Sequence, residues 1–399
     1  MGTMNELINP SVVATLSGIL RQAASAIDLK QPLPLTELEA TATALDELSL
    51  RQRSDLLSAA LISDLHSAAP LGDLHNAAPV SDPPGGYSTA AAIFRRALDD
   101  EAFAGWMMWP VTETVTTLAL ADASSAAFDD ALALLAELTP RLTSEFAIRR
   151  LLEHNLERAL TVIEPWTTHP NEHVRRLASE GTRSFLPWAI RVRALVQNPR
   201  ATAPILNALR ADDSEYVRRS VANHLNDLAR IAPTLVTDLA GEWMTDPRPH
   251  DAWVIRHGLR TLIKKGDPAA LALLGFDPVE VTVTTPQLVS ETVGLPGELE
   301  FAVEITNTSS VAGNIAVDYV VHYRKANGQQ APKVFKLTTA TLQPGQSVKV
   351  RKRHAFRQMT TRVHYPGVHG LEVQVNGQRH GATSFHLGES APGELPIAP

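Results

Sequence analysis

The stretch Asn171-Glu-His-Val-Arg-Arg-Leu-Ala-Ser-Glu180 returns, with changes, as Ser214-Glu-Tyr-Val-Arg-Arg-Ser-Val-Ala-Asn223. The two copies share a Val-Arg-Arg core, whose valines, Val174 and Val217, lie 43 residues apart. A helical phrase restated at this distance has the period of a two-helix repeat. We therefore expect consecutive helix pairs rather than a single globular bundle.

A third and weaker copy extends the repeat. Trp253-Val-Ile-Arg256 follows the second copy by 37 residues, counted between the valines. Helix pairs repeated at this interval stack into an α-solenoid of the HEAT or armadillo kind, in which each repeat packs on its neighbours. The concave face of such a solenoid offers a long binding surface.

Two carboxylates lie within the repeated phrase. Glu180 falls six positions after the shared valine, and Asp227 falls ten positions after it. At about 100° per residue, the two side chains point within roughly 40° of each other on equivalent helices. We expect them to face one cleft. The arginine doublets beside them suit a polyanion, because a guanidinium group donates two parallel hydrogen bonds to phosphate oxygens. The alternative is that these arginines are solvated side chains that pair between repeats.

The charge distribution favours a nucleic-acid partner although the net charge is −7. Residues 1–140 carry 6 Lys and Arg against 18 Asp and Glu, whereas residues 141–265 carry 19 against 14. From Arg324 to Arg362 there are 10 basic residues and no acidic ones. Two basic regions on an otherwise acidic chain are what a phosphate-tracking surface needs.

Several classes of protein are disfavoured. The chain has no cysteine, which excludes disulfides and thiolate metal sites and fits a reducing cytoplasm. We find no signal peptide and no apolar run long enough to span a bilayer. The 14 histidines contain a single His-x-x-x-His spacing, His169 to His173, which Pro170 interrupts, and no glycine-rich phosphate loop occurs. We therefore expect neither a metal nor a cofactor.

The texture of the sequence changes near residue 266. Up to residue 265, Ala- and Leu-rich runs of helical period predict helices over residues 10–26, 35–48, 51–66, 88–98, 126–138, 144–163, 171–185, 202–210, 214–232, 233–245 and 251–264. Beyond it, alternating segments predict about seven strands, chiefly residues 279–283, 297–307, 314–324, 333–342, 347–355 and 371–376. This pattern is typical of an immunoglobulin-like sandwich. We expect a helical-repeat domain over residues 5–275, a β-sandwich over 278–386 and a tail over 387–399, with residues 67–86 forming a long loop.

Three ordered strings resemble the AlkC branch of the AlkC/AlkD family of DNA glycosylases. They are Thr143-Ser-Glu-Phe-Ala-Ile-Arg149, Arg175-Arg-Leu-Ala-Ser-Glu-Gly-Thr-Arg183 and Tyr216-Val-Arg-Arg-Ser-Val-Ala-Asn-His-Leu-Asn-Asp227. The C-terminal Leu371-Glu-Val-Gln-Val-Asn-Gly377 is similar to the immunoglobulin-like appendage of AlkC proteins. The resemblance covers residues 143–386. Its departures are a divergent N-terminal third and Arg150, where the pattern leads us to expect proline.

The resemblance implies a monofunctional glycosylase that removes cationic N-methylated bases, 3-methyladenine and 3-methylcytosine, from double-stranded DNA in the bacterial cytoplasm and nucleoid. It implies three pocket acids, Glu145, Glu180 and Asp227. Such a base leaves without protonation, so a carboxylate need only stabilise an oxocarbenium-like sugar and orient water. We assign Asp227 to the sugar. The alternative for the acids is ion pairing, of Glu180 with Arg176 and of Asp227 with Arg230 or Arg219.

Aromatic and basic side chains complete the predicted site. A cation over an indole is favoured by about 0.5–2 kcal/mol, which makes Trp166 and Trp188 the candidates for the base pocket. Candidate DNA contacts are the basic and amide side chains of both regions, namely Arg149, Arg175, Arg176, Arg218, Arg219, Asn223, His224, Arg256, Lys264, Lys265, Arg351, Lys352, Arg353, Arg357 and Arg362. For the second region, the alternative is a charged sheet edge that prevents aggregation.

The expected partner is duplex DNA carrying alkylated bases, bound by a monomer without a membrane or an obligate protein partner. Two other classes stay open at this point. One is a HEAT-like scaffold that binds proteins and releases no base. The other is a structure-specific DNA binder that has kept the groove and lost the chemistry.

Overall fold

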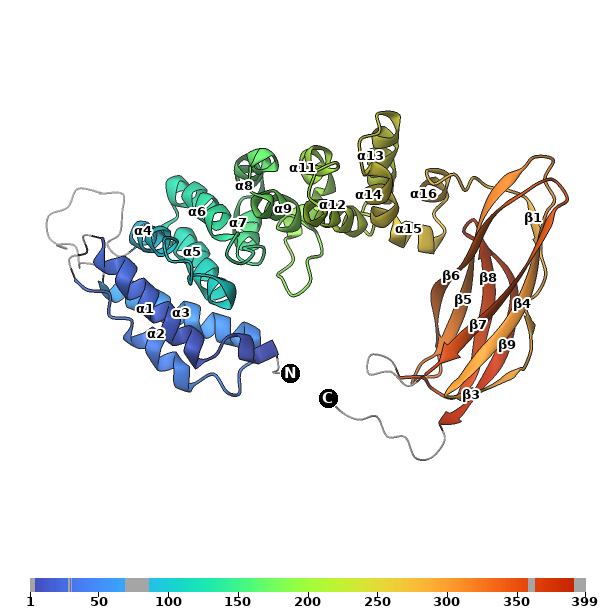
Figure 1. The fold of residues 1–399 in the computed structure, drawn as a ribbon, viewed down its shortest axis with the longest axis horizontal. Coiled ribbons are helices and arrows are strands. Elements are labelled where there is room, and N and C mark those ends of the chain that lie inside the picture. The colour runs from blue at the N-terminus through green and yellow to red at the C-terminus, as the bar shows by residue number, and fades with distance from the viewer. Residues whose placement is uncertain (1–3, 28, 30, 69–85, 358–362, 391–399) are drawn as a thin grey trace. The chain divides into compact units, whose positions relative to one another are not determined.

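The computed structural model describes residues 4–27, 29, 31–68, 86–357 and 363–390 (Figure 1). Contacts divide the chain into two compact units, Met1–Leu235 with Asp246–Gly258, and Val236–Thr245 with Leu259–Pro399. Most of the loop expected over residues 67–86, the tail beyond residue 390 and Arg362 lie outside the described residues. The domain limits expected from the sequence stay a prediction.

The helices of the described chain follow one another up to residue 272 (Figure 1). They are α1 (Pro10–Ser25), α2 (Thr36–Ala40), α3 (Leu50–Ala68), α4 (Tyr87–Ala97), α5 (Met108–Asp122), α6 (Ser125–Leu138), α7 (Ile148–His154), α8 (Leu156–Ile163), α9 (Glu172–Glu180), α10 (Arg193–Gln197), α11 (Ala203–Leu209), α12 (Glu215–Leu228), α13 (Pro233–Thr245), α14 (Asp251–Gly258), α15 (Arg260–Lys265) and α16 (Pro268–Ala272). Short 3-10 turns lie at η1 (Met4–Leu7), η2 (Thr41–Thr43), η3 (Gly105–Met107), η4 (Glu164–Thr168) and η5 (Pro199–Thr202). The predicted helical-repeat class is confirmed.

Capping side chains explain where several helices begin and where one prediction was too long. Asn171 begins α9 because its side chain accepts from the His173 N–H at 2.8 Å. The single helix expected over residues 144–163 is instead two. Asn155 has an extended backbone that ends α7, and its side chain accepts from the Arg158 N–H at 3.1 Å to start α8. Satisfying the first free N–H groups in this way is worth about 1 kcal/mol.

The repeated phrase forms the core of adjacent repeats. Helix α12 packs against both α9 and α14. The shared valine is buried in each copy, with Val174, Val217 and Val254 at most 1% exposed. Gly258 allows α14 to approach α12 closely, because a Cβ there would lie 2.8 Å from the Leu225 Cβ. Repeat spacing in the sequence thus corresponds to helix stacking.

The C-terminal region is a two-sheet sandwich, as expected. Its strands are β1 (Val281–Val283), β2 (Gln287–Leu288), β3 (Thr292–Leu295), β4 (Gly297–Asn307), β5 (Gly313–Arg324), β6 (Gln330–Leu342), β7 (Ser347–Phe356), β8 (Gly367–Val375) and β9 (Gln378–Ser390). One sheet has β1, β2 and β7 paired with β4, and the other has the order β3-β9-β8-β5-β6. Alternate residues of β4, such as Leu299 and Phe301, face the apolar core. Strand β9 extends four residues into the segment predicted as a tail.

Helices α15 and α16 are joined to the sandwich by close backbone contact within the second unit. Gly266 ends α15 and Gly377 lies in the turn after β8, and a Cβ on Gly266 would be 2.5 Å from the Gly377 Cα. The Asn376 amide donates to the carbonyls of Asp277 and Asn314, at 2.8 and 2.9 Å. Both glycines have positive φ, a region that other residues adopt only with strain. These helix ends therefore pack as part of the β-rich unit.

Candidate functional site

The three predicted acids meet in one buried network within the first unit. Glu145 precedes α7, Glu180 is the last residue of α9, and Asp227 lies in the last turn of α12. Arg176 pairs with Glu145 and lies 3.5 Å from Glu180. Arg183 pairs with Glu180 at 2.5 Å and, through Nε, with Asp227 at 2.8 Å. Acid and arginine alternate along this chain, which we call the acid network.

Hydroxyl groups fix the two glutamates further. The Thr143 hydroxyl donates to Glu145 at 2.9 Å, and the Ser220 hydroxyl donates to Glu180 at 2.7 Å. The side chains of the acid network are 6 to 14% exposed. Buried carboxylates held by both charges and hydroxyls keep a single orientation, since each lost partner would leave a desolvated charge.

The ion pairs differ in part from the alternatives left open by the sequence. Glu180 does face Arg176, one helical turn earlier, but its shorter contact is with Arg183. Asp227 pairs with Arg183 and not with the two expected arginines. Arg219 instead pairs with Glu215 at 2.5 Å, and Arg230 lies 4.7 Å from the centre of the Phe185 ring. Arg183, which the sequence analysis did not assign, is therefore the central partner.

Burial raises the pKa of Asp227 above its usual range, while Arg183 and a backbone hydrogen bond from Phe185 oppose this. Desolvation disfavours the charged form of a carboxyl, and a nearby guanidinium favours it. The balance makes the protonation state of Asp227 sensitive to Arg183. Groups with such opposed influences are common at functional sites, although structural ion pairs show them too.

Arg149 supports the loop that follows α9 rather than presenting a charge to solvent. It is fully buried, and its Nε donates to the Ile190 carbonyl at 2.6 Å. Its Nη1 donates to the carbonyls of Gly181 and Arg183, at 3.0 and 2.7 Å. Burial lowers the pKa of the Arg149 guanidinium to about 10. The predicted phosphate contact is corrected: in this structure Arg149 fastens residues 181–190.

The structure places Tyr216, and neither predicted tryptophan, beside the acid network. Arg176 lies 5.0 Å from the centre of the Tyr216 ring, which is 41% exposed. Trp166 is buried in η4, at 8% exposure. Trp188 is 69% exposed with a φ of 63°, a left-handed conformation that costs an ordinary side chain free energy. No ring contact seen in the described residues joins these tryptophans to the network's arginines.

Three further predicted DNA contacts in the repeats are occupied by internal interactions. Arg175 bonds Asp212 through two nitrogens, at 2.6 and 3.0 Å. Arg218, 9% exposed, donates to the carbonyls that precede α12. His224 is fully buried and bonds Thr202 at 3.1 Å, and burial lowers the pKa of its imidazole to about 3. In this structure these three side chains make contacts within the helical region, and Arg218 bonds the loop that precedes its own helix.

The remaining basic candidates in the helical region are on the surface. Arg219, Arg256, Lys264 and Lys265 are exposed, and Asn223 is half-buried. A side chain in water can reach a phosphate without breaking the fold. This subset, and not the whole predicted list, fits a charged surface.

The basic strand of the sandwich is partly neutralised. Arg353 pairs with Glu300 at 3.1 Å, and Lys349 lies 3.8 Å from Glu304 across the β4–β7 ladder. Arg351 faces Ala302 in the same register and is exposed, Lys352 is half-buried, and Arg357 is exposed just after β7. Strand β7 pairs with β4 in the first sheet. The observed ion pairs suit the alternative of a charged sheet edge, with Arg351 and Arg357 exposed for contact.

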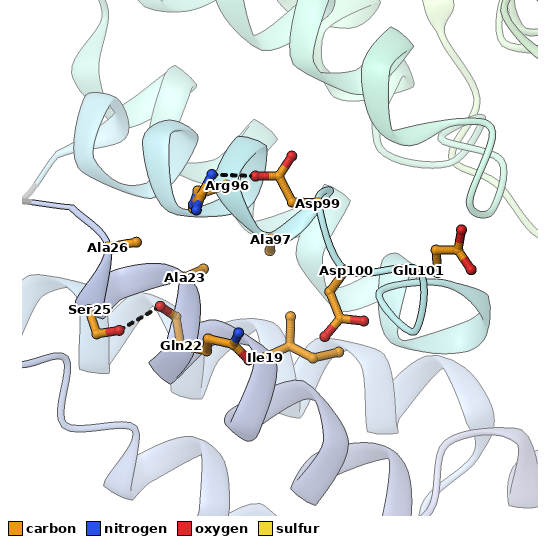
Figure 2. Close-up of a pocket in the computed structure, with 10 residues that line it drawn as sticks. All are labelled: Ile19, Gln22, Ala23, Ser25, Ala26, Arg96, Ala97, Asp99, Asp100 and Glu101. Atoms are coloured by element: carbon orange, nitrogen blue, oxygen red, sulfur yellow. Dashed lines mark hydrogen bonds and ion pairs between the residues drawn. The ribbon is translucent and has the colours of Figure 1, made fainter.

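A hollow of about 500 Å3 lies between α1 and the end of α4 and is not lined by the acid network. Its lining includes Gln22, Ser25, Arg96 and Asp99 (Figure 2). A second hollow of about 430 Å3 lies along residues 184–191 and is lined also by Arg149 and Arg230. In the described residues no group of three or more His, Cys, Asp or Glu side chains has metal-binding geometry. No helix among them is long and apolar enough to cross a membrane.

Comparison with known proteins adds to this geometry. Residues 282–389 match the family model described as the C-terminal Ig-like domain of the uncharacterised protein YhaZ. The uncharacterized protein YhaZ of Bacillus subtilis is 38% identical over 263 residues, which are 65% of this chain and 72% of YhaZ. The structure of the Pseudomonas fluorescens alkylpurine DNA glycosylase AlkC, bound to DNA containing an abasic site analog, is 33% identical with a TM-score of 0.75. That match covers 97% of this chain and all of the AlkC chain.

Fold and site together define a helical-repeat protein with a C-terminal immunoglobulin-like domain, in which arginines and acids from three segments form one buried cluster. The chain belongs to the family that includes AlkC and YhaZ.

Proposed function

We propose that this protein is a DNA glycosylase that removes cationic N-methylated bases, 3-methyladenine and 3-methylcytosine, from double-stranded DNA. The observation that carries the proposal is the meeting of Glu145, Glu180 and Asp227 in one network within a fold shared with AlkC. AlkC is an alkylpurine DNA glycosylase whose structure contains DNA. A DNA repair glycosylase is therefore the reading that both the relative and the acids support.

The chemistry requires a negative charge near the sugar and no acid for the leaving group. A base methylated at a ring nitrogen is a cation, so its glycosidic bond is already weakened. Positive charge develops on the sugar as the bond breaks, and a fixed carboxylate stabilises it. We assign that part to Asp227, which also orients the attacking water as a general base.

The two glutamates and Arg176 would shape the rest of the site. The acid network holds three carboxylates and two guanidiniums, an excess of one negative charge when all are ionised, and the buried Arg149 guanidinium outside the network also interacts with Asp227 and Glu145. A cationic base is better matched to that charge than a neutral one, because a buried charge is stabilised by an opposite partner. Tyr216, half-exposed above Arg176, offers an aromatic face at the solvent side of the network.

Base release from methylated duplex DNA tests the proposal. The protein and its Asp227→Asn variant are incubated with the duplex, and freed bases are resolved by chromatography. We expect 3-methyladenine or 3-methylcytosine from the unaltered protein and about 100-fold or more slower release from the variant, the usual size of a general-base contribution. Binding of the duplex should persist in the variant.

Asp251→Asn is the matched control. Asp251 is also a buried aspartate facing an arginine, with Arg210 at 3.6 Å, but it lies outside the acid network. Its variant should keep base release within about threefold of the unaltered protein once stability is matched. Release that survives Asp227→Asn would remove Asp227 from the mechanism. Tight, salt-dependent duplex binding with no release by the unaltered protein would favour the catalytically silent DNA binder.

A further inference from the structure

Arg183 contacts two of the acids to which the proposed mechanism assigns a role. It follows α9 by three residues and is 8% exposed. Its Nη1 bonds Glu180 at 2.5 Å and its Nε bonds Asp227 at 2.8 Å. A planar guanidinium with two separate donors fixes the angle between its acceptors, which an ammonium group does not do.

The backbone that carries Arg183 is itself held in place. The Arg183 carbonyl accepts from Arg149 at 2.7 Å, and the same guanidinium bonds Gly181 on one side and Ile190 on the other. Gly181 permits the tight exit from α9, because a Cβ there would lie 2.9 Å from the Ile148 Cγ2. Arg149 thus holds the loop by hydrogen bonds to its carbonyls, and Arg183, which that loop carries, bonds the two acids.

The loop does not end in the interior. Residues 187, 188 and 190 of the same loop are exposed, with Trp188 and Ile190 at 69 and 44%. The guanidinium carbons of Arg191 and Arg230 lie 4.9 and 4.7 Å from the centre of the Phe185 ring. A surface loop with an apolar tip thus shares its anchoring with Arg183.

We propose that Arg183 is a positioning residue that holds the Asp227 and Glu180 carboxylates in their working orientation, and that Arg149 holds Arg183 by fastening the loop that carries it. This inference rests on the proposed role of Asp227 as the carboxylate nearest the sugar. Arg183 touches neither base nor sugar in this scheme. It acts through the acids that do.

Two substitutions separate the charge of Arg183 from its geometry. Arg183→Gln removes the charge, and Arg183→Lys keeps a cation without the two-pronged donor. We expect duplex binding to stay within about threefold for both, and base release to fall about 100-fold for Arg183→Gln, the size of effect that misplacement by about 1 Å has on a catalytic group. Arg183→Lys should lose about tenfold, because a lysine cannot span both carboxylates in the same way.

The pH profile distinguishes positioning from general structural damage. Single-turnover release is measured from pH 5 to 9, with thermal unfolding as a check on folding. Because burial raises the pKa of Asp227 and Arg183 opposes this, losing Arg183 should raise it further. A base must be ionised to act, so the acidic limb of the Arg183→Gln profile should move to higher pH by about one unit. The Arg183→Lys limb should stay near that of the unaltered protein.

Arg158→Gln serves as the control for loss of an arginine–carboxylate pair. Arg158 pairs with Asp129 at 2.7 Å on the surface of the same unit, and neither side chain belongs to the acid network. This variant should match the unaltered protein in rate and in pH profile. An Arg183→Gln limb that does not move, or an Arg183→Lys variant with full activity, would overturn the positioning role.

A second readout keeps this inference distinct from the proposed function. The Asp227 carboxyl can be titrated by 13C NMR in the full-length protein labelled at aspartate Cγ, with its signal assigned by its absence in Asp227→Asn. If the unaltered protein releases no base, but Arg183→Gln still raises the Asp227 titration while Arg183→Lys leaves it near that of the unaltered protein, the proposed function fails and the control of Asp227 by Arg183 stands. If release occurs and the titration is unchanged in both variants, only the role of Arg183 fails.

Discussion

Replacing Arg149 by methionine tests whether this side chain belongs to the fold or to the DNA surface. The guanidinium makes three hydrogen bonds to main-chain carbonyls, at 2.6, 2.7 and 3.0 Å, and is fully buried. A hydrogen bond from a charged group contributes about 1.5–3 kcal/mol, so three would contribute roughly 5–9 kcal/mol. Methionine is long enough to fill most of the space but donates nothing to the carbonyls of Gly181, Arg183 and Ile190.

Burying a guanidinium has a cost that offsets part of this gain. The pKa of Arg149 falls to about 10, roughly 2.5 units below the ordinary arginine value, which corresponds to about 3 kcal/mol against the charged form. The net loss of stability in Arg149→Met should therefore be about 2–6 kcal/mol. Such a loss would rank among the larger single-residue effects, as expected for breaking a buried charged network.

Tryptophan fluorescence during urea unfolding measures this loss selectively. Five of the six tryptophans lie in the first unit and Trp243 lies in α13 of the second, so the signal reports mainly on the first unit. Arg158→Met, which removes an exposed ion pair with Asp129, should cost less than about 1 kcal/mol. The salt dependence of duplex binding supplies the second arm, since each lost phosphate contact lowers the slope by about one. A stable Arg149→Met protein with a reduced salt slope would refute the structural role and restore Arg149 to the DNA surface.

Three other predictions concern separate parts of the chain. Arg219→Gln and Arg256→Gln should each weaken duplex binding and lower the slope of its salt dependence by about one, because both arginines are exposed. Arg175→Gln should leave that slope unchanged, because Arg175 is bonded to Asp212. Fluorescence anisotropy at several salt concentrations measures the slope, and an effect confined to the Arg175 variant would contradict the prediction. Burial raises the pKa of Asp318 to about 6 against opposition from Lys336 and Lys264, so the folded state takes up the proton first and the second unit should gain about 1–3 kcal/mol as pH falls from 7 to 4. Calorimetry should show this gain abolished in Asp318→Asn, and an unchanged pH dependence would speak against it. Gly258→Ala should destabilise the first unit by about 1–3 kcal/mol, because the added methyl group would clash with Leu225. Gly18→Ala should be neutral or stabilising, because a Cβ at residue 18 meets no atom within 4 Å. Thermal unfolding of the two variants measures the difference.

The 3.6-residue period of the sequence predicted the repeated helices, but it could not predict helices whose sequence lacks that period. The phrase shared by α9 and α12 was found because each helix buries one face and exposes the other, which leaves a 3.6-residue pattern. Helix α5 was not predicted. Eleven of its fifteen residues are buried, so buried positions lie on every side of the helix and its sequence shows no apolar face opposite a polar one. A helix in the interior of a stack gives composition but no period.

The same limit applies to the acid network. The phases of Glu180 and Asp227 on equivalent helices predicted that the two would face one cleft; that cleft stays a prediction, and the structure shows that one side chain, Arg183, pairs with both. Glu145 stands before α7 rather than in the repeated phrase, so only the family resemblance pointed to it. Arg183 and Tyr216 were both inside quoted motifs, but which arginine meets which acid depends on loop geometry after α9. Sequence spacing does not encode that geometry.

Strand β9 is a part of the β region that was not predicted from the sequence. Its sequence, from Gln378 to Ser390, contains two glycines, two histidines and few β-branched residues, so alternation is weak. It is recognised in the structure because it pairs with β8 along almost its whole length and with β3 in parallel. Pairing between distant segments, and not local preference, makes this strand.

The paired glycines at the end of α15 bear on how such proteins can be recombined. Gly266 and Gly377 are 111 positions apart in the chain, yet neither accepts a side chain without displacing the other's backbone. A chimera that exchanges sandwiches at residue 277 would leave Gly266 facing a foreign turn, and any residue but glycine there would separate the two surfaces. Crossovers placed before α15 keep both halves of the contact on one parent. A crossover that exchanges the sandwich between two such proteins is therefore best placed within the helical sequence, ahead of α15 and of the first strand.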